Sequence, residues 1–326
     1  MPGQKLVSRA CFKIPLALIV LTAQAAPSQF TPDYRHRVIA SIAANVKQHY
    51  FDKQVAEITA GALLAHEQAG DYNAVSDGQA FANLLARHLV EASRDPHLTV
   101  EYTPNVFPDF SKPPPPEFQE RYRAAMERAN CTFEKVEIRA NNVGYFKLNS
   151  FPDIAACRSQ AESAMASLNR ADALIFDLRD NRGGYPNMVV FLAGYLFGHP
   201  EYMFNPRDSV TGQTWTRSPV AGSLLVDKPV YILTSSRTYS GAEQFSYDLK
   251  MLKRATLVGE TTGGANHAGA LHNIDDHFAV GIPEHRPVNP FSDKDWAFTG
   301  VEPDVKVKAA DALAAAEDMI AGARRR

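Results

Sequence analysis

Apolar residues recur every three or four positions along residues 33–92. This spacing places them on one face of a helix, so the segment is predicted to form three amphipathic helices. The apolar stripe of the first helix contains five residues: Val38, Ile39, Ile42, Val46 and Tyr50. Residues 98–102 alternate between apolar and polar side chains, which indicates a short strand after the third helix.

From residue 132 onward, short β-branched and aromatic runs alternate with helical patterns. Strands are predicted at 132–139, 143–148 and 255–258, with helices at 154–168 and 309–323. Two further units, at 173–197 and 229–253, each read as a strand, a turn and a helix. Residues 272–282 indicate a hairpin or strand pair. Alternation of this kind is typical of an α/β domain, and with the helical N-terminal region the chain is α/β in the broad α+β sense.

A proline-rich segment separates two predicted domains of the chain. Residues 104–116 are rich in proline, including four consecutive prolines at 113–116, and predict an extended linker that leads into a charged helix at 117–129. The predicted organisation is therefore a leader at 1–26, a helical domain at 27–103, the linker and its helix at 104–129, and a core domain at 130–326.

The leader has the three parts of a signal peptide. Lys5, Arg9 and Lys13 form its basic region, residues 14–21 its apolar region, and residues 23–25 (AQA) a small-residue cleavage site. A membrane anchor is the alternative, but the apolar run is shorter than the roughly 20 residues a span needs. We therefore expect an exported protein, periplasmic or secreted, with no stable membrane span after cleavage.

The net charge of the chain is small and negative. The formal net charge is −2, and removal of the three basic and no acidic residues of the leader gives −2 − 3 = −5. No basic patch with interleaved aromatic residues is present in the sequence, so nucleic acid is not an expected partner.

Ser240 is the candidate of greatest interest. It follows an apolar strand pattern at 230–233, precedes Gly241 and stands where the next helix must begin. A hydroxyl there is exposed beside helical N–H groups that stabilise developing negative charge. The simpler interpretation is structural, because Ser240 and Glu243 also form the sequence of a capping box.

Five segments together resemble peptidase family S41, the tail-specific or C-terminal processing proteases. The resemblance is closest to the branch that includes interphotoreceptor retinoid-binding protein and the core of tricorn protease. The segments are DPHL (95–98), DLRDNRGG (177–184), TSSRTYSGAE (234–243), LVGETTGG (257–264) and GVEPD (300–304). Each is weak alone, but their order across residues 30–310 is specific.

The resemblance implies a crotonase-like ββα core and a serine peptidase that acts on peptides or proteins without a cofactor. Ser240 would be the nucleophile. The backbone N–H groups of Gly241 and of either Gly183 or Gly184 would form the oxyanion hole. The turns that carry them follow neighbouring strands of one sheet, so these groups can converge.

The general base distinguishes the branches of the family. The lysine of the Ser-Lys members would fall at Ala265, so a Ser-Lys dyad is absent. In the tricorn-like branch the base is a histidine from the preceding domain, and His97 occupies that place. Without the resemblance, His97 would be taken for a surface residue. His267, in the glycine-rich turn, is a second candidate base or a substrate contact.

One departure from the pattern concerns the orienting acid. The tricorn-like branch has a glutamate where this chain has Ala297, so the acid is missing or is supplied by Asp295, Glu302 or another residue. An alternative function follows: a weakly active or inactive S41 scaffold that binds peptides or hydrophobic small molecules.

Two cysteines, Cys131 and Cys157, remain after the leader. Export permits a disulfide between them, but the sequence does not fix their separation, so the bridge stays an open alternative. No metal site is predicted. His272, His277 and Asp275–Asp276 fall on the expected hairpin without a recognised zinc spacing, and solvated turn residues are the favoured interpretation.

Overall fold

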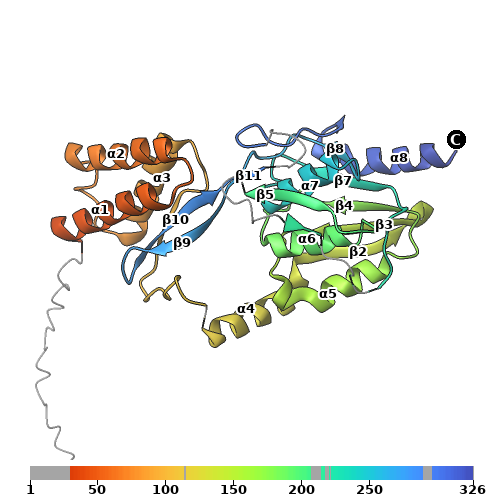
Figure 1. Cartoon of the computed structure of the whole chain (residues 1–326), viewed down its shortest axis with the longest axis horizontal. Helices are drawn as coiled ribbons and strands as arrows, with labels where there is room; N and C mark the ends of the chain where they lie inside the picture. The colour runs from red at the N-terminus through yellow and green to blue at the C-terminus, as the bar shows by residue number, and fades with distance from the viewer. Residues whose placement is uncertain are drawn as a thin grey trace, which may run out of the picture.

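The structure is a computed structural model that describes residues 30–113, 115–206, 214–216, 220, 222–288 and 296–325. The predicted leader lies outside these residues. Three helices open the described chain and pack against one another through the apolar stripes seen in the sequence (Figure 1): α1 (Pro32–His49), α2 (Lys53–Ala69) and α3 (Gly78–Ser93). The predicted helical domain is present.

A three-stranded antiparallel sheet completes this N-terminal part. Its strands are β1 (Thr99–Tyr102), β10 (Phe278–His285) and β9 (Ala268–Asn273), in that order. The β9–β10 hairpin comes from late in the chain, yet Phe278, Val280 and Ile282 join the hydrophobic cluster of the three helices. In Figure 1 this blue ribbon lies beside the orange helices. The division by sequence assigned the hairpin to the core, whereas its strands pair with β1.

A six-stranded sheet forms the centre of the core domain, in the order β12-β8-β7-β4-β3-β2. Neighbouring strands run parallel except for β2 and β3, which are antiparallel. The bounds are β2 (Phe133–Arg139), β3 (Val143–Leu148), β4 (Ala173–Asp177), β7 (Val230–Thr234), β8 (Thr256–Gly259) and β12 (Val305–Lys306). Strands β4 and β7 are buried at every position, in agreement with the four apolar residues that begin each of them.

Helices cover both faces of the sheet. The larger hydrophobic cluster lies on one face beneath α5 (Ile154–Ser167), α6 (Pro186–Gly194) and α7 (Gly241–Met251), and α8 (Ala312–Arg324) covers the other. The connecting helix α4 (Pro116–Arg128) joins the two parts of the molecule (Figure 1). The remaining short strands are β5 (Tyr202–Pro206), β6 (Thr214–Trp215) and β11 (Pro287–Val288). The predicted α/β class is confirmed.

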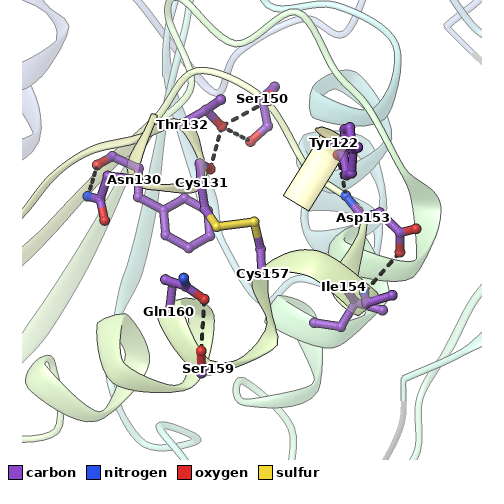
Figure 2. Close-up of a disulfide and its surroundings, with 12 residues drawn as sticks. Tyr122, Asn130, Cys131, Thr132, Ser150, Asp153, Ile154, Cys157, Ser159 and Gln160 are labelled. Carbon is purple, nitrogen blue, oxygen red and sulfur yellow. Dashed lines mark hydrogen bonds between the residues drawn. A yellow bond between two sulfur atoms is a disulfide. The ribbon is translucent and has the colours of Figure 1, made fainter. Parts of the chain in front are cut away.

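The two cysteines left open by the sequence form a disulfide. Cys131 and Cys157 are bonded, with their Cα atoms 5.9 Å apart, and both are fully buried (Figure 2). The bond fastens α5 to the segment that leads into β2. Nothing in the part of the chain described here forms a helix long and apolar enough to cross a membrane.

Candidate functional site

Ser240 lies at the N-cap of α7, six residues after the end of β7. Its backbone has φ 51° and ψ −119°, a conformation that L-residues rarely adopt. Strain of this kind costs about 1–3 kcal/mol and persists only where the surroundings enforce it, often at functional sites. The side chain is half-buried at the first turn of the helix. This sharp strand-to-helix turn is the geometry that exposes a nucleophilic hydroxyl.

The Glu243 carboxylate holds this turn against the glycine-rich turn that follows β8. It accepts hydrogen bonds from the Ser240 N–H at 2.9 Å, the Thr262 hydroxyl at 2.5 Å, and the N–H groups of Gly264 and Ala265 at 2.6 and 2.8 Å. Burial raises the pKa of Glu243 above its usual range, and these four hydrogen bonds oppose that shift. The capping box predicted from sequence is therefore present and serves the strained turn as well.

The turn after β4 lies directly against Ser240. The Tyr239 N–H donates to the Asn181 carbonyl at 3.0 Å, which ties the two turns together. Gly183 has φ +93°, and a Cβ at this position would lie 2.8 Å from the Ser240 Cβ and 2.7 Å from the Gly241 nitrogen. Only glycine permits this approach.

The two candidate glycines of this turn differ in their N–H groups. The Gly183 N–H donates to the Asn181 side-chain oxygen at 2.8 Å, so it is already engaged. The Gly184 nitrogen lies 3.2 Å from where a Cβ of Gly241 would stand. The two alternatives from sequence therefore differ, because the Gly183 N–H already has an acceptor within its own turn.

Asp95 is the most deeply buried carboxylate near the predicted base, with no exposed surface. Its Oδ1 accepts from the His97 backbone N–H at 2.9 Å and lies 3.2 Å from His97 Nδ1. Its Oδ2 accepts from the Tyr50 hydroxyl at 2.9 Å and lies 2.5 Å from His267 Nδ1. Burial acts to raise the pKa of Asp95, but the hydrogen bonds from His267 and His97 outweigh it and hold that pKa well below its usual range.

His97 lies just before β1 and faces the core domain. Its ring centroid is 5.7 Å from that of Tyr239, the residue before Ser240. With Nδ1 directed at Asp95, the other ring nitrogen, Nε2, is buried and has no hydrogen-bond partner in the structure. A histidine held this way has one nitrogen fixed by an acid and one free to accept a proton.

His267 stands on the opposite side of Asp95. Its ring is almost fully buried and packs against Phe51 and Phe298, with centroid separations of 4.6 and 5.7 Å. Its ring centroid lies 5.9 Å from that of His97. The second candidate base therefore shares the same carboxylate as the first.

The acids named from sequence as supporting residues lie elsewhere. The Glu302 side chain is exposed and pairs with Lys306 at 3.1 Å, while its carbonyl accepts from Lys250. Asp295 lies outside the described residues. The carboxylate that contacts both histidines is Asp95. Asp95 belongs to the DPHL segment, but no role was predicted for it from sequence.

A cleft of about 820 Å³ separates the two parts of the molecule beside His97. It is lined by residues of β1, β9 and β10, by residues 108–110 and 112 of the linker, by Phe118 of α4 and by Tyr185, which follows Gly184. Its lining is mostly apolar with a few charged residues, among them Glu101 and Lys112. A groove of this size, with the His97 ring in its wall, can receive an extended chain.

Comparison with known proteins gives matches across almost the whole described chain. The family described as peptidase family S41 matches residues 142–307, and the N-terminal domain of S41 peptidases in eukaryotic IRBP matches residues 33–134. Carboxyl-terminal-processing proteases from Synechocystis and Picosynechococcus are 26% and 24% identical over 157 and 212 residues, which is 45% and 59% of this chain. The matches span 36% and 50% of those two proteins.

Solved structures agree on the fold. A lipoprotein from Streptococcus agalactiae superposes with a TM-score of 0.59 at 13% identity, covering 91% of this chain and 98% of that one. The photosystem II D1 C-terminal processing protease gives 0.52 at 15% identity, with 84% and 93% covered. Tricorn protease gives 0.55 at 15% identity, with 90% and 37% covered. With the strained Ser240 turn, the paired glycines and a family match over half of its length, the chain belongs to peptidase family S41, a family of serine-type hydrolases.

Proposed function

We propose that this protein is an exported serine peptidase that hydrolyses peptide bonds through an acyl-enzyme on Ser240. The observation that best supports the proposal is the strained turn at Ser240, which lies at the N-terminus of α7 with Gly183 in close contact. A capping serine needs no positive φ, since N-cap residues normally have extended backbone. The additional strain is explained if the hydroxyl must be presented to a substrate.

His97 serves as the general base. Its Nε2 takes the proton from the Ser240 hydroxyl as Oγ attacks the substrate carbonyl, and then passes that proton to the leaving amine as the C–N bond breaks. Water, activated by the same nitrogen, then hydrolyses the ester and restores Ser240. The Nδ1 contact with Asp95 supports this role. Nε2 has no hydrogen-bond partner in the structure, so the proposal requires it to approach the Ser240 hydroxyl when substrate binds.

Asp95 takes the place of the absent glutamate as the orienting acid. It contacts the base through Nδ1, it is ionised because its pKa is lowered, and it is held from its other side by Tyr50 and His267. An ionised carboxylate in this position fixes the ring and stabilises the imidazolium that forms during attack. His267 acts as a positioning residue through Asp95.

The oxyanion hole is formed by the N–H groups of Gly241 and Gly184. The Gly241 N–H belongs to the first turn of α7, where the helix dipole also favours negative charge. Gly183 contributes by its lack of a side chain, because its own N–H is engaged by Asn181.

Export is supported by two independent features. Residues 1–26 have the sequence of a cleaved leader. The buried bond between Cys131 and Cys157 is of the kind that persists in oxidising compartments such as the periplasm or the extracellular space.

The test is labelling with a fluorophosphonate probe, whose phosphorus is attacked by an activated serine. The wild-type protein should label, and Ser240→Ala should not. His97→Ala should reduce the labelling rate at least about 10²-fold, the usual contribution of a general base. His267→Ala should reduce it less, because His267 acts through Asp95.

Two results would redirect the proposal. If His267→Ala abolishes labelling while His97→Ala leaves the rate unchanged, His267 is the base. If the wild-type protein does not label at all, the chain is an inactive scaffold that binds peptides or hydrophobic small molecules.

A further inference from the structure

A second group of histidines lies away from Ser240, where α1 meets the β9–β10 hairpin. His49 is the last residue of α1, His272 lies on β9 and Glu284 on β10. Glu284 Oε1 is 2.8 Å from His272 Nε2 and 3.4 Å from His49 Nδ1. The two imidazole rings stack with their centroids 4.0 Å apart. Three potential ligand atoms thus lie within 4.8 Å of one another.

These distances are close to those around a metal ion. In a tetrahedral zinc site with bonds of about 2.1 Å, neighbouring ligand atoms are about 3.4 Å apart. The separation between Glu284 Oε1 and His49 Nδ1 has this value, and the separation from His272 Nε2 needs to open by about 0.6 Å. We propose that His49, His272 and Glu284 bind one zinc ion, with water as its fourth ligand.

The donor set suits zinc. Two neutral imidazoles and one carboxylate with an open fourth position form an established class of zinc site, whereas magnesium and calcium prefer oxygen ligands alone.

Coordination requires the stacked rings to rotate, because their planes are only 25° apart and a shared ion must lie in both. Each ring must turn so that its plane contains the ion, and the side chains of His49 and His272 are 28% and 21% exposed, which leaves room for this rotation. The backbone beneath is already fixed, because the Phe51 N–H donates to the Pro283 carbonyl at 3.1 Å. The ligands are therefore carried on segments that the fold already holds together.

A zinc ion here would act as a cross-link between α1 and the hairpin. The hairpin contributes Gly269–Leu271 and Gly281–Pro283 to the cleft wall, so the ion would stabilise that wall without touching Ser240. Because an unfolded chain does not bring these three residues together, zinc would raise the stability of the native state by mass action.

The experiment measures zinc bound to the full chain, independently of activity. Purified protein is stripped with a chelator, dialysed and titrated with zinc chloride, and bound metal is measured by inductively coupled plasma mass spectrometry. The wild-type protein should bind one zinc per chain, and its melting temperature should rise by at least about 3 °C at 100 times the dissociation constant.

The variants locate the ion. His49→Ala, His272→Ala and the isosteric Glu284→Gln should each weaken binding at least about 100-fold and remove the rise in melting temperature. His36→Ala is the matched control, because this exposed histidine also lies on α1 but outside the cluster, and it should bind zinc like the wild-type protein.

Asp95, His97 and His267 form another group of potential ligands within 4.8 Å, so His97→Ala is included. The proposal is overturned if the stripped wild-type protein binds no zinc at micromolar concentration. It is also overturned if binding survives in His49→Ala and His272→Ala, or is lost only in His97→Ala, since the ion would then lie at the peptidase site.

Discussion

Replacing Asp95 by asparagine is the most informative single change, because it removes a charge while keeping the shape of the side chain. Asp95 Oδ1 faces the His97 backbone N–H, which can only donate, so an asparagine must direct its oxygen there and its NH₂ group toward Tyr50 and His267. The Tyr50 hydroxyl can turn to accept a hydrogen bond. The contact with His97 is thus retained, and what is lost is the negative charge beside its ring.

The size of the catalytic effect follows from the separation of 3.2 Å between Asp95 Oδ1 and His97 Nδ1. At an effective dielectric constant of about 20, Coulomb's law gives about 5 kcal/mol at this distance. Both charges are spread over several atoms, which reduces the interaction to about 3–4 kcal/mol. A loss of this size in the stabilisation of the imidazolium corresponds to a rate lower by about 10²–10³-fold.

The assay is the second-order rate of fluorophosphonate labelling, measured for wild-type protein and Asp95→Asn between about pH 5 and 9, the range in which histidines usually titrate. Tyr50→Phe is the control, since it removes one hydrogen bond to the carboxylate but keeps its charge, and it should slow labelling by less than about tenfold. If Asp95→Asn labels at the wild-type rate while His97→Ala is silent, Asp95 does not orient the base.

The same substitution changes the stability of the protein. Hydrogen bonds to charged groups contribute about 1.5–3 kcal/mol each, so losing the charge shared by His97 and His267 should lower the free energy of unfolding by about 2–4 kcal/mol at neutral pH. Because the folded-state pKa of Asp95 is depressed, its contribution is present above the unfolded pKa of about 3.9 and is lost as the pH falls toward the folded value. The stability of Asp95→Asn should therefore fall less steeply than that of the wild-type protein below about pH 4.

Two further predictions concern the scaffold. Replacing Cys131 and Cys157 together by serine opens a loop with a sequence separation of 26, which should lower the free energy of unfolding by about 3–4 kcal/mol in a denaturant titration; an unchanged midpoint would contradict this. Glu243→Gln leaves one oxygen for four donors, so two lose their acceptor, and we expect a loss of about 2–4 kcal/mol together with labelling of Ser240 slowed at least tenfold. The exposed Glu302→Gln should stay within about 0.5 kcal/mol of the wild-type protein; an equal loss in both would show that the effect is not specific to the turn.

Sequence patterns predicted the elements whose signals are local. Strands β4 and β7 each begin with four apolar residues in a row, a pattern typical of a buried strand, and every position in both is buried. The end of α6 was predicted at Phe197 but lies at Gly194, an error typical of helix boundaries. The β9–β10 hairpin was predicted as a unit. Its pairing with β1 depends on contacts between distant segments, which periodicity does not encode.

The candidate site shows the same division between local and distant signals. Ser240 and the paired glycines were identified because their turns have strong local sequences. Asp95 lies two residues before His97, so a local signal existed: an acid so close to a candidate base can reach its ring. The partnership of Asp95 with His267 could not be read in this way, since 172 positions separate them. His49 is likewise distant from His272 and Glu284, which is why the hairpin alone gave no zinc spacing.

Under the proposed function, the alanine at position 297 reflects an acid that has moved to Asp95, which contacts His97. The segment around it lies along the glycine-rich turn, because the Phe298 N–H donates to the Gly264 carbonyl and the Phe298 ring packs against His267. A glutamate at 297 would add a carboxylate one residue before Phe298, whose ring packs against the histidine that contacts the buried Asp95. Like charges placed near one another disfavour each other's ionised form, so a second carboxylate beside this group would raise the pKa of one of the two acids. An uncharged residue at 297 is therefore compatible with an ionised Asp95, and the departure from the family pattern agrees with the proposal that Asp95 orients the base.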